Sequence, residues 1–337
     1  MKSSERIKSY IPWITIAAVI ILLPLIIPSP YVISMMVFVA LYGVLVIGMG
    51  ILMGQAGLFS LTQPTWFGLG AYVAGILAVR GILPAWIGII VGAAFVAVIS
   101  YIIGAPVLRL RGLYLACATF GILIIAEIAF VQLGDITGGH SGLLGIPPLS
   151  IGGFVFQTDL HYYFLSWALC IGCLWFSYNV INSRVGRAIK SSRDSEVASK
   201  TLGVNIPKYR LQIYVLTSVM AGLAGGIFCF YLRLIAPSCF GFALLVELIL
   251  MAVIGGIGSV WGLLLGSFVI TWLSEFVHMY LGKFLPVMTG EVDAIFFGIL
   301  VILVLIFMPR GLAGWVEQLF HLGKRGYEHF SRKVSRA

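Results

Sequence analysis

Long runs of apolar residues, separated by short polar connections, dominate the sequence. Ten such runs occur, at 11–28, 32–53, 66–79, 84–107, 112–132, 161–182, 210–231, 243–256, 260–278 and 293–308. Twenty helical residues span roughly 30 Å, the thickness of the hydrocarbon core of a bilayer. Because the runs are continuously apolar and do not alternate, they favour helices over barrel strands. The pattern predicts an all-α polytopic membrane protein with about ten transmembrane helices, in which residues 1–337 form a single transmembrane domain.

Two of the runs are short, and glycine is concentrated beside them. Runs 66–79 and 243–256 are short for a full crossing, while segments 48–57 and 255–262 hold too many glycines for an unbroken helix. A broken helix exposes backbone groups, which are tolerated at depth only where protein or a watery cavity satisfies them. Transport pathways are often lined in this way. The candidate path residues are therefore Gln55, Gly57, Gly256 and Gly258.

Other glycines have the spacing of helix-packing motifs. They form Gly222-x-x-x-Gly226 and Gly258-x-x-x-Gly262-x-x-x-Gly266. Small residues at this spacing let helix backbones approach closely in a membrane, so we interpret these motifs as packing sites without a transport role.

Three carboxylates lie within apolar runs. Glu127 and Glu247 are candidates for the translocation path, and Glu275 is close enough to the end of its run to reach the interface. A carboxylate that faced lipid would be unfavourable by a few kcal/mol, so each must find a polar partner. The alternative to a substrate or ion role is a hydrogen bond between helices.

Charge is scarce and asymmetric. Only 10% of residues are charged, against about 25% in an average soluble domain, and the net charge is +9. If the N-terminus is cytoplasmic and the spans alternate, 18 of the 21 Lys and Arg residues fall in the inside segments 1–10, 105–111, 183–210 and 309–337. This bias matches the positive-inside rule and predicts that both termini are cytoplasmic. The positive charge therefore indicates topology and no nucleic-acid partner.

The beginning of the chain has some features of a signal peptide. Lys2, Arg6 and Lys8 precede an apolar stretch, but no small-residue cleavage site follows it. We therefore expect the stretch to be retained as the first span.

Two polar segments interrupt the runs. Residues 133–160 form an external loop rich in Gly and Pro, and residues 183–209 form a basic cytoplasmic loop. In the second loop, Asp194 and Glu196 suit a helix N-terminus and Gly203 suits its end. An apolar stripe lies between them, made by Val197, Ala198, Thr201 and Leu202. We predict one short amphipathic helix parallel to the membrane, which docks in a groove of a cytoplasmic partner; the alternative is a merely interfacial helix.

The sequence holds no motif for catalysis, for a cofactor or for metal binding. Gly282-Lys283-Phe284 lacks the Ser or Thr of a phosphate-binding loop, and no HExxH motif is present. Cys170-x-x-Cys173 lies inside an apolar run, so we interpret both cysteines as small hydrophobic residues. We expect no catalytic residue, no cofactor and no metal, so any ATP hydrolysis must reside in another chain.

Several motifs together resemble one transporter family. The loop contains Gly186-Arg187-Ala188 and then Glu196-x-Ala198-x-x-x-Leu202-Gly203, and further blocks that contain glycine occur at 54–61, 108–114 and 255–262. Their order and spacing over most of the chain resemble the LivM-type permeases, membrane subunits of bacterial branched-chain amino-acid ABC importers. One departure is Thr62-Gln63-Pro64, where the family usually has Gly-His-Ala, which alters the start of a helix.

The resemblance implies a function and a set of partners. It implies a permease of the bacterial inner membrane that pairs with a second homologous permease, with ABC ATPase subunits, with an external substrate-binding protein and with membrane lipid. The residues expected to couple ATP binding to transport are Arg187, Asp194, Glu196, Ala198, Leu202 and Gly203. The cargo would be branched-chain amino acids moving inward. The alternatives are urea, short amides or another small solute, or an ion-coupled secondary transporter.

Overall fold

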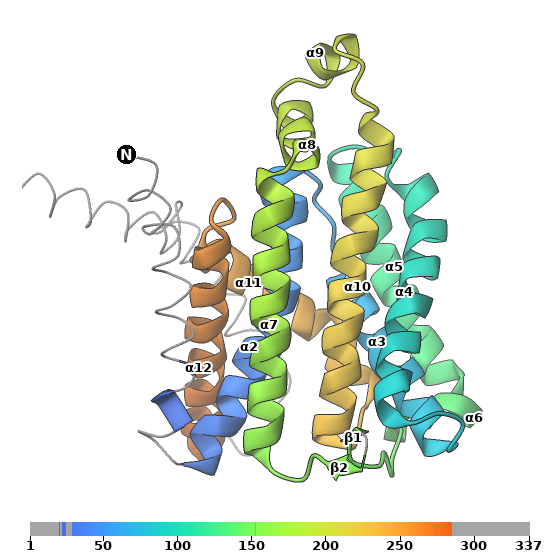
Figure 1. The fold of residues 1–337 in the computed structure, drawn as a ribbon. Coiled ribbons are helices and arrows are strands. Elements are labelled where there is room, and N and C mark those ends of the chain that lie inside the picture. Colours follow the sequence, from blue (N-terminus) through green and yellow to red (C-terminus); the bar gives the residue numbers. More distant parts are fainter. Residues whose placement is uncertain (1–19, 21, 25–28, 152, 285–337) are drawn as a thin grey trace, which may run out of the picture.

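The computed structural model describes residues 20, 22–24, 29–151 and 153–284 (Figure 1). The predicted first run, 11–28, therefore lies almost entirely outside the described residues. The predicted run 293–308 and the tails 1–10 and 309–337 lie wholly outside them.

Each predicted run in the described part corresponds to one helix. These helices are α2 (Pro30–Gly50), α3 (Gln63–Val79), α4 (Ala85–Val107), α5 (Leu113–Gln132), α7 (Asp159–Asn182), α10 (Ile206–Leu232), α11 (Phe242–Gly255) and α12 (Val260–Phe284). Six helical segments of the described part are long and apolar enough to cross a membrane. The prediction of an all-α polytopic membrane fold is confirmed.

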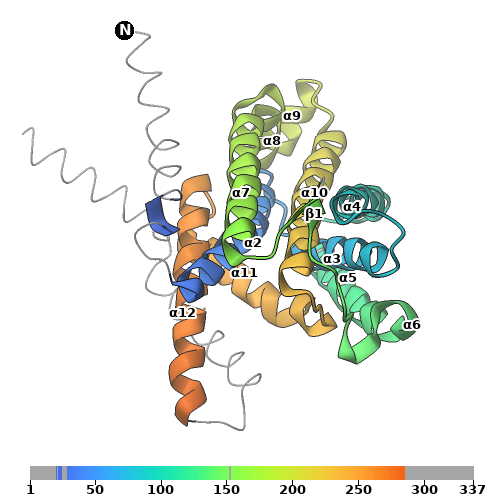
Figure 2. The same ribbon diagram turned by 60° about the horizontal axis from the view of Figure 1, so that its bottom comes forward.

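Helix α10 lies at the centre of the bundle and packs against α3, α4 and α2, while α2 also contacts α7 and α12 (Figures 1 and 2). Glycine allows these close approaches. A Cβ atom on Gly225 of α10 would overlap the carbonyl oxygen of Phe67 in α3, and one on Gly226 would come 2.9 Å from Ile89 of α4. A Cβ on Gly266 of α12 would meet the backbone of α11. The packing interpretation is therefore confirmed for Gly226 and Gly266, whereas a Cβ atom on Gly258 would lie in open space.

The two glycine-rich segments break their helices, as predicted. After α2 the chain forms a π-helix, η1 (Ile51–Gln55), and then runs without helix through residues 56–62 until α3 begins at Gln63. A hydroxyl satisfies one backbone group of this break, because the Leu61 amide donates to Thr119 Oγ1 at 3.2 Å. The Thr62 side chain is held by Tyr214, whose hydroxyl lies 3.1 Å from Thr62 Oγ1, and by Trp66, whose Nε1 donates to that oxygen at 2.9 Å. The second break follows α11, where Gly256 has a φ of +90°.

The predicted external loop is largely ordered. It contains α6 (Gly134–Thr137), the 3-10 turn η2 (Gly139–Ser141) and the antiparallel strands β1 (Ser150–Ile151) and β2 (Phe154–Val155). Leu143 pairs with Ile235 in a β-bridge, which ties the loop to the chain just before the 3-10 turn η3 (Pro237–Phe240). The loop is thus fixed to the connection between α10 and α11.

The opposite end of the bundle carries two short helices in place of the predicted one. They are α8 (Arg184–Asp194) and α9 (Glu196–Thr201), which extend beyond the ends of α7 and α10 (Figure 1). The prediction that Asp194 belongs to the first turn of the second helix is wrong, because Asp194 ends α8. Ser195 separates the helices, since its backbone is extended and its hydroxyl caps α9.

Candidate coupling site and translocation path

Local capping defines the segment made by α8 and α9. Ser183 Oγ accepts from the Gly186 amide at 3.3 Å, and Ser195 Oγ accepts from the Ala198 amide at 3.3 Å, so each helix has an N-cap. Gly203 has a φ of +77°, in agreement with its predicted position at the helix end. Asn205, in contrast, caps the start of α10 by accepting from the Lys208 amide at 3.3 Å. Caps at both ends fix where the segment turns.

The apolar stripe of α9 faces away from the bundle. Val197 is 76% exposed and Leu202 is 81% exposed, and Ala198 is exposed beside them. The inner side of α9 carries Ser199, which is buried and donates to Ser191 Oγ of α8 at 3.2 Å. The stripe thus leaves apolar surface open at the outermost point of this end of the molecule.

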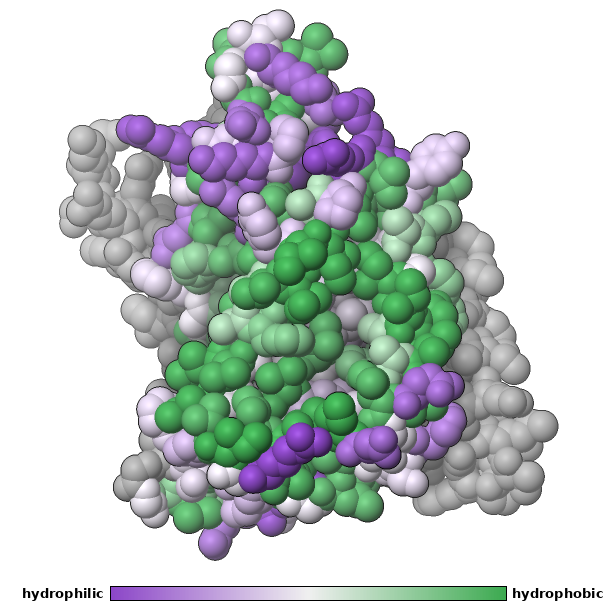
Figure 3. All heavy atoms as spheres, turned by 90° about the vertical axis from the view of Figure 1, so that its right-hand side faces the viewer, coloured by the Kyte–Doolittle hydropathy of each residue, from purple (hydrophilic) through white to green (hydrophobic). Residues whose placement is uncertain are grey.

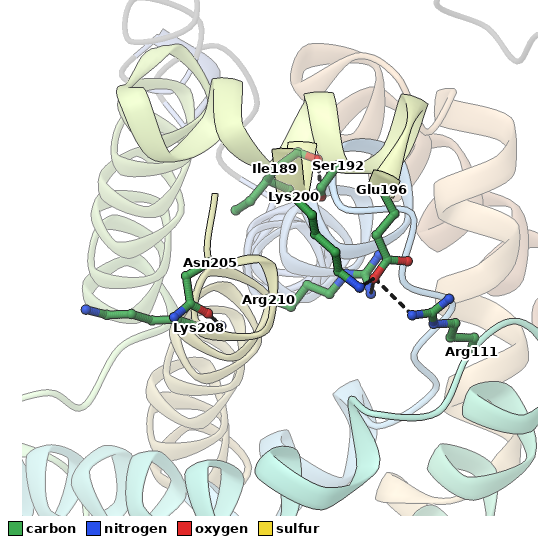
Figure 4. A network of polar contacts seen from close by, with 8 residues as sticks. All are labelled: Arg111, Ile189, Ser192, Glu196, Lys200, Asn205, Lys208 and Arg210. Carbon is green, nitrogen blue, oxygen red and sulfur yellow. Dashed lines mark hydrogen bonds and ion pairs between the residues drawn. The ribbon is translucent and has the colours of Figure 1, made fainter. Parts of the chain in front are cut away.

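Glu196 belongs to the inner side of the segment and is surrounded by cations (Figure 4). Its Oε1 lies 3.1 Å from Arg111, 3.4 Å from Lys200 and 3.8 Å from Arg210. Arg111 follows α4, and Arg210 lies in the first turns of α10. The carboxylate therefore ties α9 to two membrane helices, while the neighbouring apolar stripe stays free.

Removing this carboxylate should loosen α9 without unfolding the bundle. In Glu196→Gln three cations lose their shared partner, and because Arg111 and Lys200 are largely exposed we expect a loss of only about 1 kcal/mol of local stability. Hydrogen exchange of the α9 amides should accelerate about fivefold, while exchange in α10 beyond its first turns stays unchanged. If the α9 amides exchanged at the same rate in the variant and the parent, the ion pairs of Glu196 would not hold α9 in place.

Two further predicted coupling residues lie on α8. The Arg187 guanidinium donates to the Asn182 carbonyl oxygen at 2.9 Å and so covers the end of α7. Asp194 is exposed at the other end of α8. They lie on the surface of the segment, at opposite ends of the same helix.

Arg193 joins α8 to the first helix break. Its guanidinium donates to the carbonyl oxygen of Gly54 in η1, where a helix end leaves carbonyl groups without partners. A Cβ atom on Gly57 would lie 3.1 Å from Arg193 Cγ, so the arginine chain packs along the break. Sequence reasoning did not single out Arg193, because nothing distinguishes it from the other basic residues of the loop.

The two helix breaks meet at this point. A Cβ atom on Gly54 would overlap the carbonyl oxygen of Ile257, which lies in the second break. The structure thus gathers four predicted path residues around one place: Gln55 at the end of η1, Gly57 with a φ of +64°, Gly256, and the exposed Gly258.

The carboxylates lie elsewhere. The Glu127 side chain contacts Gly241, whose Cβ would come 2.7 Å from Oε1, so the charge lies at the N-terminus of α11 where a helix favours an acid. Glu247 lies within α11, near enough to Tyr42 of α2 for the two groups to interact electrostatically. Glu275 accepts from the Tyr31 hydroxyl at 2.8 Å, which confirms for this residue the hydrogen bond between helices.

A buried amide next to the first break was missed by the sequence analysis. Gln63 is 1% exposed, and its amide nitrogen and oxygen have no hydrogen-bond partner among the described residues. Its amide lies beside Gly48 of α2, because a Cβ on Gly48 would come 3.3 Å from the Gln63 amide nitrogen; the same Cβ would come 3.4 Å from Thr217 of α10. The signal was Thr62-Gln63-Pro64, the departure that places the start of α3.

Among the residues that the structure describes, no group of three or more His, Cys, Asp or Glu side chains comes together to hold a metal ion. Cys170 and Cys173 are buried in α7 as free thiols.

Comparison with known proteins agrees with this architecture. The family model described as "Branched-chain amino acid transport system / permease component" matches residues 31–305. The permease protein LivM of a high-affinity branched-chain amino acid transport system from Escherichia coli (strain K12) is 25% identical over 295 residues, which cover 81% of this chain and 67% of that protein. The corresponding permease protein BraD of Pseudomonas aeruginosa is 24% identical, over 82% of this chain and 92% of that protein.

A third relative is similar over slightly less of the chain. A probable branched-chain amino acid transport permease protein LivH from Methanocaldococcus jannaschii is 25% identical over 76% of this chain and 82% of that protein. No solved structure matches the chain. Because the family model covers most of the sequence, the chain belongs to the family of permease components of branched-chain amino acid transport systems.

Proposed function

We propose that the chain is the membrane-spanning permease subunit of an ABC importer in a bacterial inner membrane, and that it carries branched-chain amino acids inward. The family match and the named functions of the relatives support this proposal. Residues 1–337 would form one transmembrane permease domain. ATP hydrolysis belongs to a separate partner chain.

The orientation follows from the distribution of charge. Arg109, Arg111 and the basic residues of α8 and α9 gather at one end of the bundle, whereas Arg80 and Arg233 lie at the other. The positive-inside rule then makes the α8–α9 end cytoplasmic. With about ten spans, both termini are cytoplasmic as well, and segment 133–160 is external, where a substrate-binding protein would deliver its cargo.

The exposed stripe of α9 is the observation that carries the coupling proposal. A partner ATPase would accept Val197, Ala198 and Leu202 in an apolar groove, with Arg187, Asp194 and Gly203 around them. Movement of α8 and α9 would be transmitted to the two helix breaks by Arg193, which binds the Gly54 carbonyl oxygen. Gln55, Gly57, Gly256 and Gly258 would line the path there, and a second homologous permease would complete it.

Acidic residues in the stripe should prevent ATPase binding. In the double variant Val197→Asp/Leu202→Asp, two charges would enter an apolar groove, so we expect copurification with the ATPase to fall at least tenfold. Both side chains are exposed, so folding should be retained. The measurement is the ATPase-to-permease ratio after gentle extraction of the assembled complex.

The matched control is Leu144→Asp, which changes a 63% exposed leucine at the opposite end of the molecule and should leave the ratio unchanged. Undiminished copurification of the double variant would exclude α9 as the docking element.

Uptake by the reconstituted complex then tests cargo and energy source together. Accumulation of leucine should require ATP, whereas accumulation under an ion gradient by this chain alone would identify a secondary transporter.

A further inference from the structure

A pocket of about 970 Å³ opens between the end of α4, helix α9 and the start of α10. Its charges are unbalanced. Five basic residues and one acidic residue line it: Arg109, Arg111, Lys200, Lys208, Arg210 and Glu196. The ion-pair cluster therefore occupies one side of a larger cationic site.

The single carboxylate does not neutralise this site. Glu196 is shared among Arg111, Lys200 and Arg210 through one oxygen atom. Arg109 forms no ion pair among the described residues, and the buried Nε of Arg210 has no hydrogen-bond partner there. Lys208 also lines the pocket, although its side chain is turned away from Glu196 (Figure 4). Basic side chains of the pocket thus remain able to bind a further anion.

The other half of the pocket is apolar and follows the membrane helices. Tyr101 and Ala105 of α4, and Leu108 directly after it, line this half together with Leu211 and Val215 of α10. Tyr101 precedes Leu108 by seven residues, so this wall extends roughly 10 Å along α4. Figure 3 shows the corresponding side of the molecule, where a hydrophilic belt borders a broad hydrophobic band. A ligand of this pocket needs an anionic head and an apolar tail.

We propose that the pocket binds the headgroup of an anionic phospholipid from the cytoplasmic leaflet, with the first part of an acyl chain along α4 and α10. This proposal rests on the cytoplasmic orientation given above. Basic pockets between membrane helices on the cytoplasmic side suit such headgroups. The C-terminal segment 309–337 of the chain is a poor occupant, because it holds six basic and two acidic residues. A soluble anion would use the cations and leave the apolar wall uncovered.

The bound lipid would connect three elements that Glu196 already holds together. Its phosphate would accept hydrogen bonds from Arg109 and Arg111 after α4 and share Arg210 of α10 with Glu196. Since Glu196 and the phosphate compete for the same cations, loss of the carboxylate should strengthen lipid binding. A purely structural role of these arginines would not produce that increase.

The test measures lipid bound to the full-length chain, purified without its partners and placed in nanodiscs of phosphatidylcholine with increasing phosphatidylglycerol. Native mass spectrometry counts the lipids retained after release from the discs. We expect preferential retention of phosphatidylglycerol by the parent chain, and about a tenfold loss in Arg109→Gln/Arg111→Gln. Glu196→Gln should raise retention, and Arg109→Lys/Arg111→Lys should keep most of it.

The control is Arg80→Gln/Arg233→Gln, which removes the same charge from the opposite end and should behave like the parent. The proposal would be overturned if Arg109→Gln/Arg111→Gln and Arg80→Gln/Arg233→Gln retained equal amounts of phosphatidylglycerol. It would also be overturned if the parent chain retained phosphatidylglycerol and phosphatidylcholine equally. Displacement of the lipid by glycerol 3-phosphate at equal concentration would also overturn it and identify a soluble phosphate as the ligand. Because no ATPase or uptake is measured, the outcome is separate from that of the proposed function.

Discussion

Gly225→Ala is expected to be among the most damaging single substitutions in this chain. The added methyl group would overlap the carbonyl oxygen of Phe67 and come 2.9 Å from its carbonyl carbon and 3.0 Å from the Ala71 amide nitrogen. These are backbone atoms of α3, so no side chain can move aside, and the two helices must separate. Overpacking of this kind destabilises by about 1–3 kcal/mol, and more where backbone must shift. Thermal unfolding in detergent, followed by size-exclusion chromatography, should show a lower midpoint and less folded protein.

Gly121→Ala provides the matched comparison. Gly121 lies within α5, and among the described residues no atom outside the adjacent backbone of that helix lies within 4 Å of the position of its added Cβ. The same change there should be neutral, or stabilising by up to about 1 kcal/mol, because alanine favours helix over glycine. If both variants unfolded at the same temperature, the close approach of α3 and α10 would not be a source of stability.

The positions of the helices could be predicted because each depends on local sequence. A run of about twenty apolar residues has few alternatives to a helix in lipid, so α4 and α5 begin and end within a residue or two of their predicted runs. The start of α10 was placed four residues late. The pattern places polar Lys208 in the loop, whereas the Asn205 cap and Pro207 begin the helix before it.

The candidate site was predictable only in its local part. The stripe on α9 depends on residues four and five positions apart, and its exposed side appears in the sequence as a pattern. The contact of Arg111 with Glu196 joins residues 85 positions apart, and that of Arg193 with Gly54 joins residues 139 apart. Such contacts depend on the packing of α4, α8 and η1, which the spacing of apolar residues does not specify.

The division between α8 and α9 shows how one polar residue changes a prediction. The acids Asp194 and Glu196 appeared to mark one helix start, because either suits a first turn. Ser195 lies between them with an extended backbone, and its hydroxyl accepts a hydrogen bond from the Ala198 amide. One acid therefore ends a helix and the other begins the next, and a search for a capping serine would have separated them.

The second prediction with a large expected effect concerns Arg193. Arg193→Ala should uncouple transport from ATP hydrolysis, because the guanidinium is the hydrogen-bonded link between α8 and the carbonyl of Gly54 at the first helix break. A hydrogen bond to a charged group contributes about 1.5–3 kcal/mol, so leucine uptake by the reconstituted complex should fall about tenfold or more. ATPase copurification should persist, since Val197 and Leu202 are untouched.

Lys190→Ala separates this effect from a general loss of charge on α8. Lys190 is exposed on the same helix, and its removal lowers the net charge by the same amount. We expect uptake close to that of the parent in this variant, with the same ATPase content. If Arg193→Ala and Lys190→Ala supported equal uptake, movement of α8 would have to reach the helix breaks by another contact. If Arg193→Ala also lost the ATPase, the arginine would belong to the docking surface and not to the link behind it. Retained ATPase with lost uptake is the result that identifies Arg193 as that link.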